Sequence, residues 1–324
     1  MSKTRAARGL LDALLVFFLA ACGPAEVAPS IPPLKVAWTF REGDYTLLVA
    51  QQMGFFDEHN VEVEPVLYDS TARSIPDLAG AEIDASLLSM GELILGSSVA
   101  DLKGVMVYDS GPVYSVVASP DIASIAQLRD RRLGVNLHSS SGMFVAYMLE
   151  RAMLTSRQVI LVEMSPEEVV QNIPEEVDAG LVWEPFTTQA LQQGNELLFR
   201  SDVYSALVPG LIVFRTAIVE QYPDKIRAFL LAWNDAVEYR LIHPQEAQDL
   251  ISQATGLPGS QLGITGDDRL YTIQENIGLF AEEAGTDPSS IYYVAQFNLA
   301  YIISLGDITN PPDLQDILDP SYLR

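Results

Sequence analysis

Strand-like and helix-like patterns alternate along most of this chain, and this alternation is the feature that most limits its possible folds. Residues 34–38 and 61–66 alternate apolar and polar side chains, as short strands do, and residues 45–53 between them carry apolar side chains at helical spacing. Gly54 marks the end of that helix. A strand, helix, strand order predicts parallel strands joined by right-handed crossovers, so we expect an α/β fold.

Two capping boxes extend the same pattern. Ser89 with Glu92, and Ser165 with Glu168, have the spacing at which a serine caps the first helical N–H groups and a glutamate reaches back. Each box follows an apolar strand-like run, so each predicts a turn from strand to helix. Residues 131–153 add a further strand (131–136) followed by a helix (143–153).

One short phrase occurs twice. The chain reads EIDASLL at residues 82–88 and EVDAGLV at residues 176–182. Both copies lead from an aspartate into a short apolar run with small residues, which is typical of a buried parallel strand that backbone or ligand approaches closely. A length of 324 residues also exceeds what one core usually spans. We therefore predict two lobes of similar plan, with chance similarity of composition as the alternative.

The last third of the chain has a different pattern. Four segments read as helices with few strands among them: 222–242, 244–254, 271–284 and 288–305. The fold class predicted from the sequence is therefore α/β, two-lobed, with a helical C-terminal region.

The first residues indicate export. Three basic residues within the first eight precede a nine-residue apolar run at 13–21, and Cys22 follows directly. The run is much shorter than the ~20 apolar residues that span a membrane, and small residues precede the cysteine as at a cleavage site. We predict a signal peptide over residues 1–21.

Cys22 is the only cysteine of the chain, so no internal disulfide can form. The sequence Leu19-Ala20-Ala21-Cys22 resembles the lipobox of bacterial lipoproteins, although an acid at position 12 departs from that pattern. The resemblance implies cleavage before Cys22, lipidation of Cys22, and a protein anchored to the cell membrane that faces the periplasm or the exterior. Residues 22–33, rich in proline and alanine, read as a lipidated, extended tether.

Charge and motif content exclude several classes of function. The formal net charge is −24, which repels phosphate backbones, so nucleic acid is not expected as a partner. The chain has three histidines and lacks the H-E-x-x-H, G-x-S-x-G, P-loop and G-x-G-x-x-G patterns. We therefore expect no catalytic residues, no metal site, no cofactor and no enzymatic activity.

A tetrapeptide after the second copy of the phrase carries the most specific resemblance. Trp183-Glu184-Pro185-Phe186 resembles the signature of the SsuA/THI5-like (NMT1-like) substrate-binding proteins of ABC importers. Residues 50–56 (AQQMGFF), 80–85 and 128–135 (LRDRRLGV) are similar to further family segments, in the same order.

The resemblance implies a periplasmic-binding-protein fold of the two-crossover type, type II, whose lobes close on ligand by hinge motion. Lobe 1 would be residues 34–118 together with the returning chain at 212–324, and lobe 2 residues 119–211. The implied function is that of a monomeric solute-binding lipoprotein that delivers a small organic ligand to the permease and ATPase subunits of an ABC importer. Some THI5-like proteins are enzymes that make a thiamine pyrimidine, and this is the less favoured alternative.

In open α/β sheets, ligands bind beyond the carboxyl ends of the strands. The candidate ligand-binding residues are Trp38, Thr39, Arg41 and Tyr45 after the first strand, then Ser89, Met90, Tyr114, Ser139, Ser140, Ser141, Trp183 and Glu184. Each of these residues also has a purely structural interpretation. Trp38 could lie in the core, Arg41 could be a solvated cation on a loop, and one of the three serines could simply cap a helix. Aromatic residues outnumber cations here, which favours a thiamine-type pyrimidine, a flavin or a similar heterocycle over nitrate. An alkanesulfonate or taurine, held by serine hydroxyls and a helix N-terminus, is the alternative.

Overall fold

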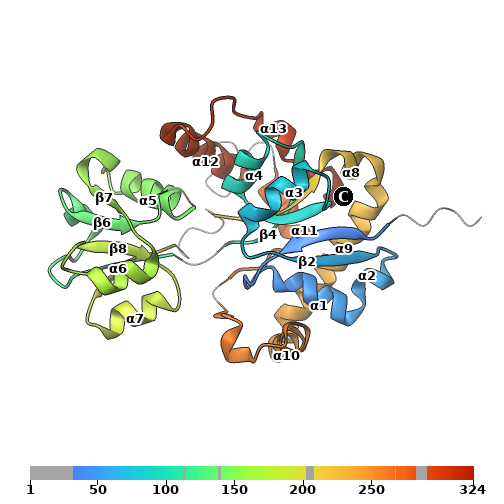
Figure 1. Cartoon of the computed structure of the whole chain (residues 1–324), viewed down its shortest axis with the longest axis horizontal. Coiled ribbons are helices and arrows are strands. Elements are labelled where there is room, and N and C mark those ends of the chain that lie inside the picture. The colour runs from blue at the N-terminus through green and yellow to red at the C-terminus, as the bar shows by residue number, and fades with distance from the viewer. Residues whose placement is uncertain (1–31, 112–113, 138–139, 202–207, 267, 282–289) are drawn as a thin grey trace, which may run out of the picture. The chain divides into compact units, whose positions relative to one another are not determined.

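A computed structural model describes residues 32–111, 114–137, 140–201, 208–266, 268–281 and 290–324 (Figure 1). The predicted signal peptide, Cys22 and nearly all of the tether lie outside these residues. Residues 33–324 form one compact unit that contains two five-stranded sheets. Within the described part of the chain, no helix is long and apolar enough to cross a membrane.

The first sheet has the strand order β2-β1-β3-β10-β4. Its strands are β1 (Leu34–Trp38), β2 (Val63–Leu67), β3 (Ala85–Ser89), β4 (Leu102–Asp109) and β10 (Gly210–Arg215). Strand β1 pairs in parallel with β2 and β3, whereas β10 is antiparallel to both of its neighbours.

The second sheet repeats this plan in the order β7-β6-β8-β5-β9. Its strands are β5 (Ser115–Ala118), β6 (Arg132–Val135), β7 (Ile160–Glu163), β8 (Ala179–Val182) and β9 (Glu196–Arg200). Strand β6 is parallel to β7 and β8, and β5 is antiparallel to β8 and β9. The predicted lobe boundary at 118 puts β5 in lobe 1. Strand β5 instead pairs in the second sheet, and outside that sheet its backbone would be left unpaired.

The repeated phrase supplies the third strand of each sheet, β3 and β8, and its aspartates explain why the phrase recurs. Asp84 Oδ2 accepts a hydrogen bond from the backbone N–H of Lys35 at 3.0 Å, and Asp178 Oδ2 accepts one from the N–H of Arg132 at 2.8 Å. Each acceptor lies just before its own strand and satisfies a donor at the start of the neighbouring parallel strand. The same local chemistry therefore aligns β3 with β1 and β8 with β6.

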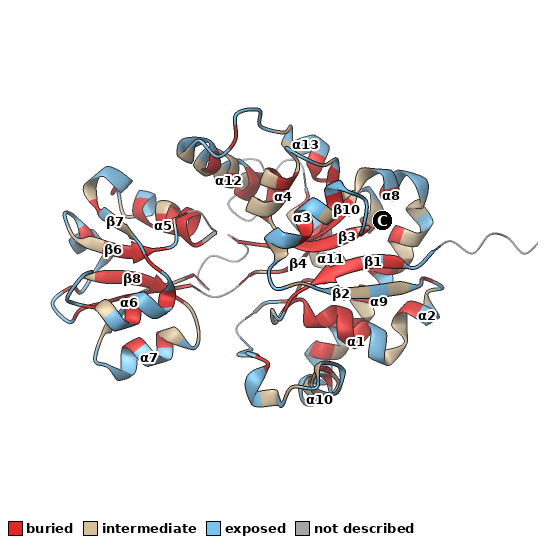
Figure 2. Cartoon of the chain, in the orientation of Figure 1, coloured by how far each residue is buried: buried red, intermediate tan, exposed pale blue. Residues whose placement is uncertain are grey.

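The helices cover both sheets. Those that supply side chains to the core of the first sheet are α1 (Tyr45–Met53), α2 (Phe55–Glu58), α3 (Ile75–Ala79), α4 (Met90–Gly96), α8 (Thr216–Gln221), α9 (Pro223–Ile242), α10 (Pro244–Thr255), α11 (Ile273–Leu279), α12 (Ile291–Leu305) and α13 (Leu314–Ile317). The second sheet carries α5 (Ser140–Arg151), α6 (Pro166–Asn172) and α7 (Phe186–Gln192). In both sheets the inner strands are largely buried, whereas the edge strands β2, β7 and β9 hold no buried residue. The outer helix faces are exposed (Figure 2).

Most local predictions from the sequence are confirmed. Strand β1 and helix α1 have the predicted bounds, and Gly54 ends α1 in the left-handed region with φ of 77°. Both predicted capping boxes are present, at the starts of α4 and α6.

The differences occur at element ends. Strand β2 begins two residues later than predicted and holds Pro65, which is tolerated because β2 is an edge strand with a free side. Helix α5 begins at Ser140 rather than 143, and α11 ends at Leu279. Residues 282–284 and 288–289 of the last two predicted helices lie outside the described residues.

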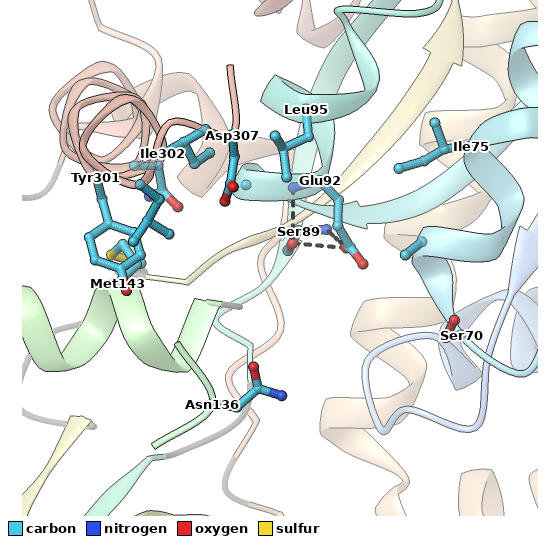
Figure 3. A pocket seen from close by; sticks show the side chains of 14 residues that line it. Ser70, Ile75, Ser89, Glu92, Leu95, Asn136, Met143, Tyr301, Ile302 and Asp307 are labelled. Atoms are coloured by element: carbon cyan, nitrogen blue, oxygen red, sulfur yellow. Dashed lines mark hydrogen bonds between the residues drawn. The ribbon is translucent and has the colours of Figure 1, made fainter. Parts of the chain in front are cut away.

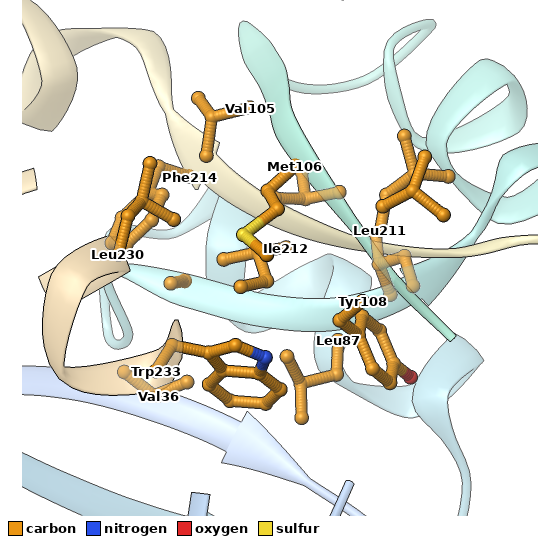
Figure 4. Close-up of a cluster of buried hydrophobic side chains, with 14 of the residues drawn as sticks. Val36, Leu87, Val105, Met106, Tyr108, Leu211, Ile212, Phe214, Leu230 and Trp233 are labelled. Atoms are coloured by element: carbon orange, nitrogen blue, oxygen red, sulfur yellow. The ribbon is translucent and has the colours of Figure 1, made fainter. Parts of the chain in front are cut away.

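The larger core belongs to the first sheet and is centred on α9. Trp233 of α9 is fully buried against Tyr108 of β4, with ring centroids 5.5 Å apart (Figure 4). Side chains of three strands, among them Val36, Leu87 and Phe214, complete this cluster. Burial on this scale fixes α9 and the first sheet as one body, from whose strand ends the loops of the candidate site project.

Candidate ligand-binding site

A cavity of about 490 Å³ is lined by residues that follow strands of both sheets and by residues of the C-terminal region (Figure 3). The lining residues are Ser70, Ala72, Ile75, Ser89, Gly91, Glu92, Leu95, Asn136, Met143, Asn298, Tyr301, Ile302, Leu305 and Asp307. Its size falls within the range of small-molecule sites, and most of its wall is apolar with a few polar groups.

The corner of the cavity at the start of α4 is held by a hydrogen-bond network. Glu92 Oε2 accepts from the backbone N–H and the hydroxyl of Ser89, both at 2.8 Å, and Thr71 Oγ1 donates to Glu92 Oε1. The hydroxyl of Ser89, a predicted ligand-binding residue, thus takes part in a capping box, and Met90 beside it is fully buried. Glu92 contributes negative charge to this corner in a fixed position.

The opposite wall comes from the turn between β6 and α5. Ser141 is buried and its hydroxyl donates to the Asn136 carbonyl at 3.0 Å. Tyr301 of α12 donates its hydroxyl to the Leu137 carbonyl at 2.8 Å, which joins the C-terminal helix to this turn. Of the two other predicted serines, Ser139 and the side chain of Ser140 lie outside the described residues.

The turn after β1 is mostly closed by its own contacts. Trp38 is 7% exposed and packs edge-on against Phe40 and Tyr45, with ring centroids 5.4 and 6.5 Å away. The hydroxyl and backbone N–H of Thr39 both donate to Asp44 Oδ2 at 2.8 Å. The buried Tyr45 donates its hydroxyl to the Leu262 carbonyl at 2.8 Å. These three residues do not line the cavity, and ligand contact by them stays a prediction.

Arg41 is paired with a buried acid. Its guanidinium lies 3.2 Å from Asp109 Oδ2 and its side chain is 28% exposed. Asp109 Oδ1 accepts from the backbone N–H groups of Gly111 and Gly210, at 3.1 and 2.9 Å. These two glycines lie where the chain leaves the first sheet and where it returns, so one carboxylate ties both crossings together.

Burial also perturbs the acids next to this pair. The pKa of Asp109 is raised because its carboxylate is removed from water, although Arg41 opposes the effect. Burial raises the pKa of Asp44 to about 6, against the charge of Arg41 and the 2.6 Å hydrogen bond from Tyr108. Desolvation and the nearby Asp109 raise the pKa of Asp268 to about 8. Arg41 is therefore surrounded by several acids.

The tetrapeptide after β8 forms an aromatic corner in the second lobe. Trp183 is half-buried and packs edge-on against Tyr114, with ring centroids 5.7 Å apart. Tyr114 is buried, and its backbone N–H donates to Ser201 Oγ at 2.8 Å. Glu184 Oε2 accepts from the N–H of Thr188 at 3.2 Å, within the first turn of α7. Trp183, Tyr114 and Glu184 do not line the cavity, and ligand contact by them stays a prediction.

The sequence matches the family described as NMT1/THI5 like over residues 45–247. The chain belongs to this family. The matched segment includes α1, most of the strands of both sheets, and the Trp183 corner, whereas α12 lies outside it.

Two relatives of this NMT1/THI5-like chain carry names of different kinds. The "Putative aliphatic sulfonates-binding protein" of Bacillus subtilis (strain 168) is 25% identical over 254 residues, which cover 75% of this chain and 76% of that protein. The "Putative thiamine biosynthesis protein" of Haemophilus influenzae is 25% identical over 256 residues, 73% of this chain and 79% of that protein.

Solved structures support the fold. The periplasmic aliphatic sulphonate binding protein SsuA from Escherichia coli superposes with a TM-score of 0.71 at 15% identity, over 89% of this chain and 92% of that one. The periplasmic nitrate-binding protein NrtA from Synechocystis PCC 6803 gives a TM-score of 0.59 at 14% identity, over 91% and 88%. The predicted periplasmic-binding-protein fold is confirmed by these likenesses.

The wall that α12 supplies was not among the predicted ligand-binding residues: Asn298 and Tyr301, with Asp307 just beyond. The segment 291–305 is apolar on all sides, which is typical of a helix that packs against more than one neighbour. Asn298 is a polar residue within that apolar run, and this is the sequence feature that could have indicated a contribution to the site. Among the described residues, no group of three or more His, Cys, Asp or Glu could hold a metal ion.

Proposed function

We propose that this protein is an extracytoplasmic solute-binding protein of an ABC importer, which captures a small organic molecule between its two lobes and delivers it to a permease. The observation that carries the proposal is the cavity lined from the carboxyl ends of strands in both sheets, in a member of the NMT1/THI5-like family. The names of the solved structures, binding proteins for sulphonate and nitrate among them, support a carrier over an enzyme.

The first residues give the proposed location. Residues 1–21 serve as a signal peptide, Cys22 carries lipid, and residues 23–33 hold a monomeric body near the membrane. Radiolabelled palmitate should enter the wild-type protein, and Cys22→Ala should abolish the labelling. Equal labelling of both proteins would contradict lipidation at Cys22.

Two ligand classes compete. A heterocycle such as a thiamine-type pyrimidine or a flavin is supported by the lining, which contains Glu92 and Asp307 and no lysine or arginine among its fourteen residues. An alkanesulfonate is supported by the names of the Bacillus and Escherichia relatives. For the sulfonate, the one cation among the predicted ligand-binding residues is Arg41. It does not line the cavity, and its guanidinium is already paired with Asp109. The chain's own charges therefore favour the heterocycle.

A thermal-shift screen of residues 23–324 against thiamine pyrimidines, flavins, alkanesulfonates and nitrate tests the function. A ligand at ~100 times its Kd adds ~2.7 kcal/mol to the free energy of unfolding. Tight binding with the ligand unchanged by mass spectrometry would support the carrier, and covalent turnover would support the THI5-like enzyme. A folded protein that responds to no compound would contradict the proposed ligand classes.

A further inference from the structure

Helix α12 packs on two cores. Its residues Ile291, Ala295 and Ile302 join the core of the first sheet, whereas Tyr293, Phe297 and Tyr301 pack on the core of the second. The rings of Phe297 and Tyr147 of α5 lie edge-on, with centroids 5.2 Å apart. The helix is therefore fixed on both sides, and the cavity side chains between its two packed faces have defined positions.

Asn298 is the polar side chain that lies between these faces. It is 2% exposed, and its Nδ2 donates to the Val294 carbonyl at 2.9 Å. Because that carbonyl is an acceptor, it fixes the orientation of the amide and leaves Oδ1 on the other side. Among the described residues, none donates a hydrogen bond to Asn298 Oδ1.

The unused acceptor belongs to a side chain that lines the cavity. Asn298 belongs to the cavity lining, and a Cβ built on Gly91, also a lining residue, would lie 3.7 Å from Asn298 Oδ1. The oxygen therefore lies over the first turn of α4, beside the Ser89 and Glu92 corner. Among the described residues, the fully buried side-chain atoms without a partner are Thr187 Oγ1, Trp233 Nε1 and Tyr271 OH. Asn298 Oδ1 is not one of them, so it keeps some access to the cavity, where a donor from outside the chain can reach it.

The charge around this oxygen decides which partner it can take. Glu92 and Asp307 line the same cavity and bring two acidic side chains to it. An anion would meet these charges and an acceptor oxygen, with no lysine or arginine in the lining to offset them. An amino group, neutral or cationic, would satisfy Oδ1 and be attracted by the carboxylates.

We infer that Asn298 determines the specificity of the ligand site, by accepting a hydrogen bond from an amino N–H of an uncharged or cationic ligand such as an aminopyrimidine. The inference rests on the proposed function and narrows its ligand class. It places a determinant of specificity in α12, outside the segment that matches the family.

Calorimetry with three compounds tests the inference: 4-amino-2-methylpyrimidine, 2-methylpyrimidine, which lacks the amino group, and ethanesulfonate. The wild type should bind the aminopyrimidine ~10- to 100-fold more tightly than 2-methylpyrimidine, since a site built around a buried polar group rejects the analogue that cannot pair with it. This comparison needs no variant, so it holds even if a substitution impairs folding.

Variants then assign the effect to one atom. Asn298→Leu, similar in volume but without the acceptor, should weaken binding of the aminopyrimidine at least ~10-fold and leave 2-methylpyrimidine unchanged. Asn298→Asp keeps the acceptor and should retain binding. Ile303→Ala is the matched control, because Ile303 lies on the same helix, is 46% exposed and does not line the cavity.

The outcomes separate the inference from the proposed function. Preferential binding of ethanesulfonate would overturn the inference and leave the carrier function standing. Equal affinity of wild type and Asn298→Leu for the aminopyrimidine would also overturn it. A folded wild-type protein that binds none of the three compounds would overturn the inference. If it also binds no flavin, thiamine pyrimidine or nitrate, the result would count against the proposed function as well.

Discussion

Asp109 offers the sharpest test of how the two lobes are joined. Its fully buried carboxylate accepts from Gly111 and Gly210 through Oδ1 and from Arg41 through Oδ2. Asp109→Ala removes the acceptor of two backbone N–H groups, and each buried donor left unsatisfied costs ~1–3 kcal/mol. Arg41 is 28% exposed and can regain water, so its lost ion pair adds at most ~1 kcal/mol. We expect the free energy of unfolding to fall by about 3–5 kcal/mol.

Asp109→Asn should behave differently. Its amide oxygen can still accept from both glycines, and the substitution removes a carboxylate whose pKa burial raises, that is, whose ionised form burial disfavours. Losing the attraction to Arg41 lowers the free energy of unfolding, whereas removing a buried charge raises it. We therefore expect a change within ~1 kcal/mol of the wild type at neutral pH.

Urea unfolding of residues 23–324, followed by far-UV circular dichroism, measures both variants. For a slope of about 3 kcal/mol per molar urea, the alanine variant should lose about 1 M or more from its midpoint. An alanine variant within ~0.5 kcal/mol of the wild type would show that the crossings do not depend on this acceptor. An asparagine variant as unstable as the alanine variant would show that the charge, rather than the acceptor, is what the site requires.

Three further predictions concern backbone space, pH and the aromatic corner. Gly278→Ala, in open space on α11, should stabilise the protein by ~0.5–1 kcal/mol. Gly210→Ala should destabilise it by ~1–3 kcal/mol, because its Cβ would lie 2.2 Å from Asp109 Oδ1. Thermal unfolding compares the two variants. The raised pKa of Asp44, about 6 against an ordinary 3.8, means that the native state holds this proton more tightly than the unfolded chain. This proton contributes up to ~3 kcal/mol to the free energy of unfolding below pH ~4, and the contribution is lost as the pH rises through ~6. The difference in unfolding free energy between wild type and Asp44→Asn should therefore vary with pH in that interval. A constant difference would refute this. Trp183→Ala should weaken ligand binding by ~1–3 kcal/mol in calorimetry, and unchanged affinity would assign the ring to packing on Tyr114 alone.

The elements that the sequence predicted well are those whose causes are local. The bounds of β1 and α1, the glycine that ends α1, and both capping boxes depend on residues within a few positions of one another. The repeated phrase also led to the correct pair of strands, since the same aspartate makes the same backbone contact in each sheet.

The remaining features depend on partners far away in the sequence. Arg41 pairs with Asp109, 68 positions later, and Tyr301 with Leu137, 164 positions earlier, and no short-range pattern indicates either contact. The predicted loops after β3 and β6 do contribute to the cavity, through Ser89 and Asn136. The wall formed by α12 was missed because a helix that is apolar on all sides does not show which neighbours it will meet.

The position of β10 has a consequence for the order in which the protein is assembled. Strand β10 lies between β3 and β4, yet Gly210 is 101 residues beyond Asp109, its partner at the end of β4. The second sheet, by contrast, is built from one continuous stretch of chain between β5 and β9. Because long-range pairing slows folding, we expect the second sheet to form first and the first sheet to be completed only when β10 inserts. A chain that emerges from a membrane pore with its N-terminus first would therefore hold β3 and β4 unjoined until its second lobe had been delivered.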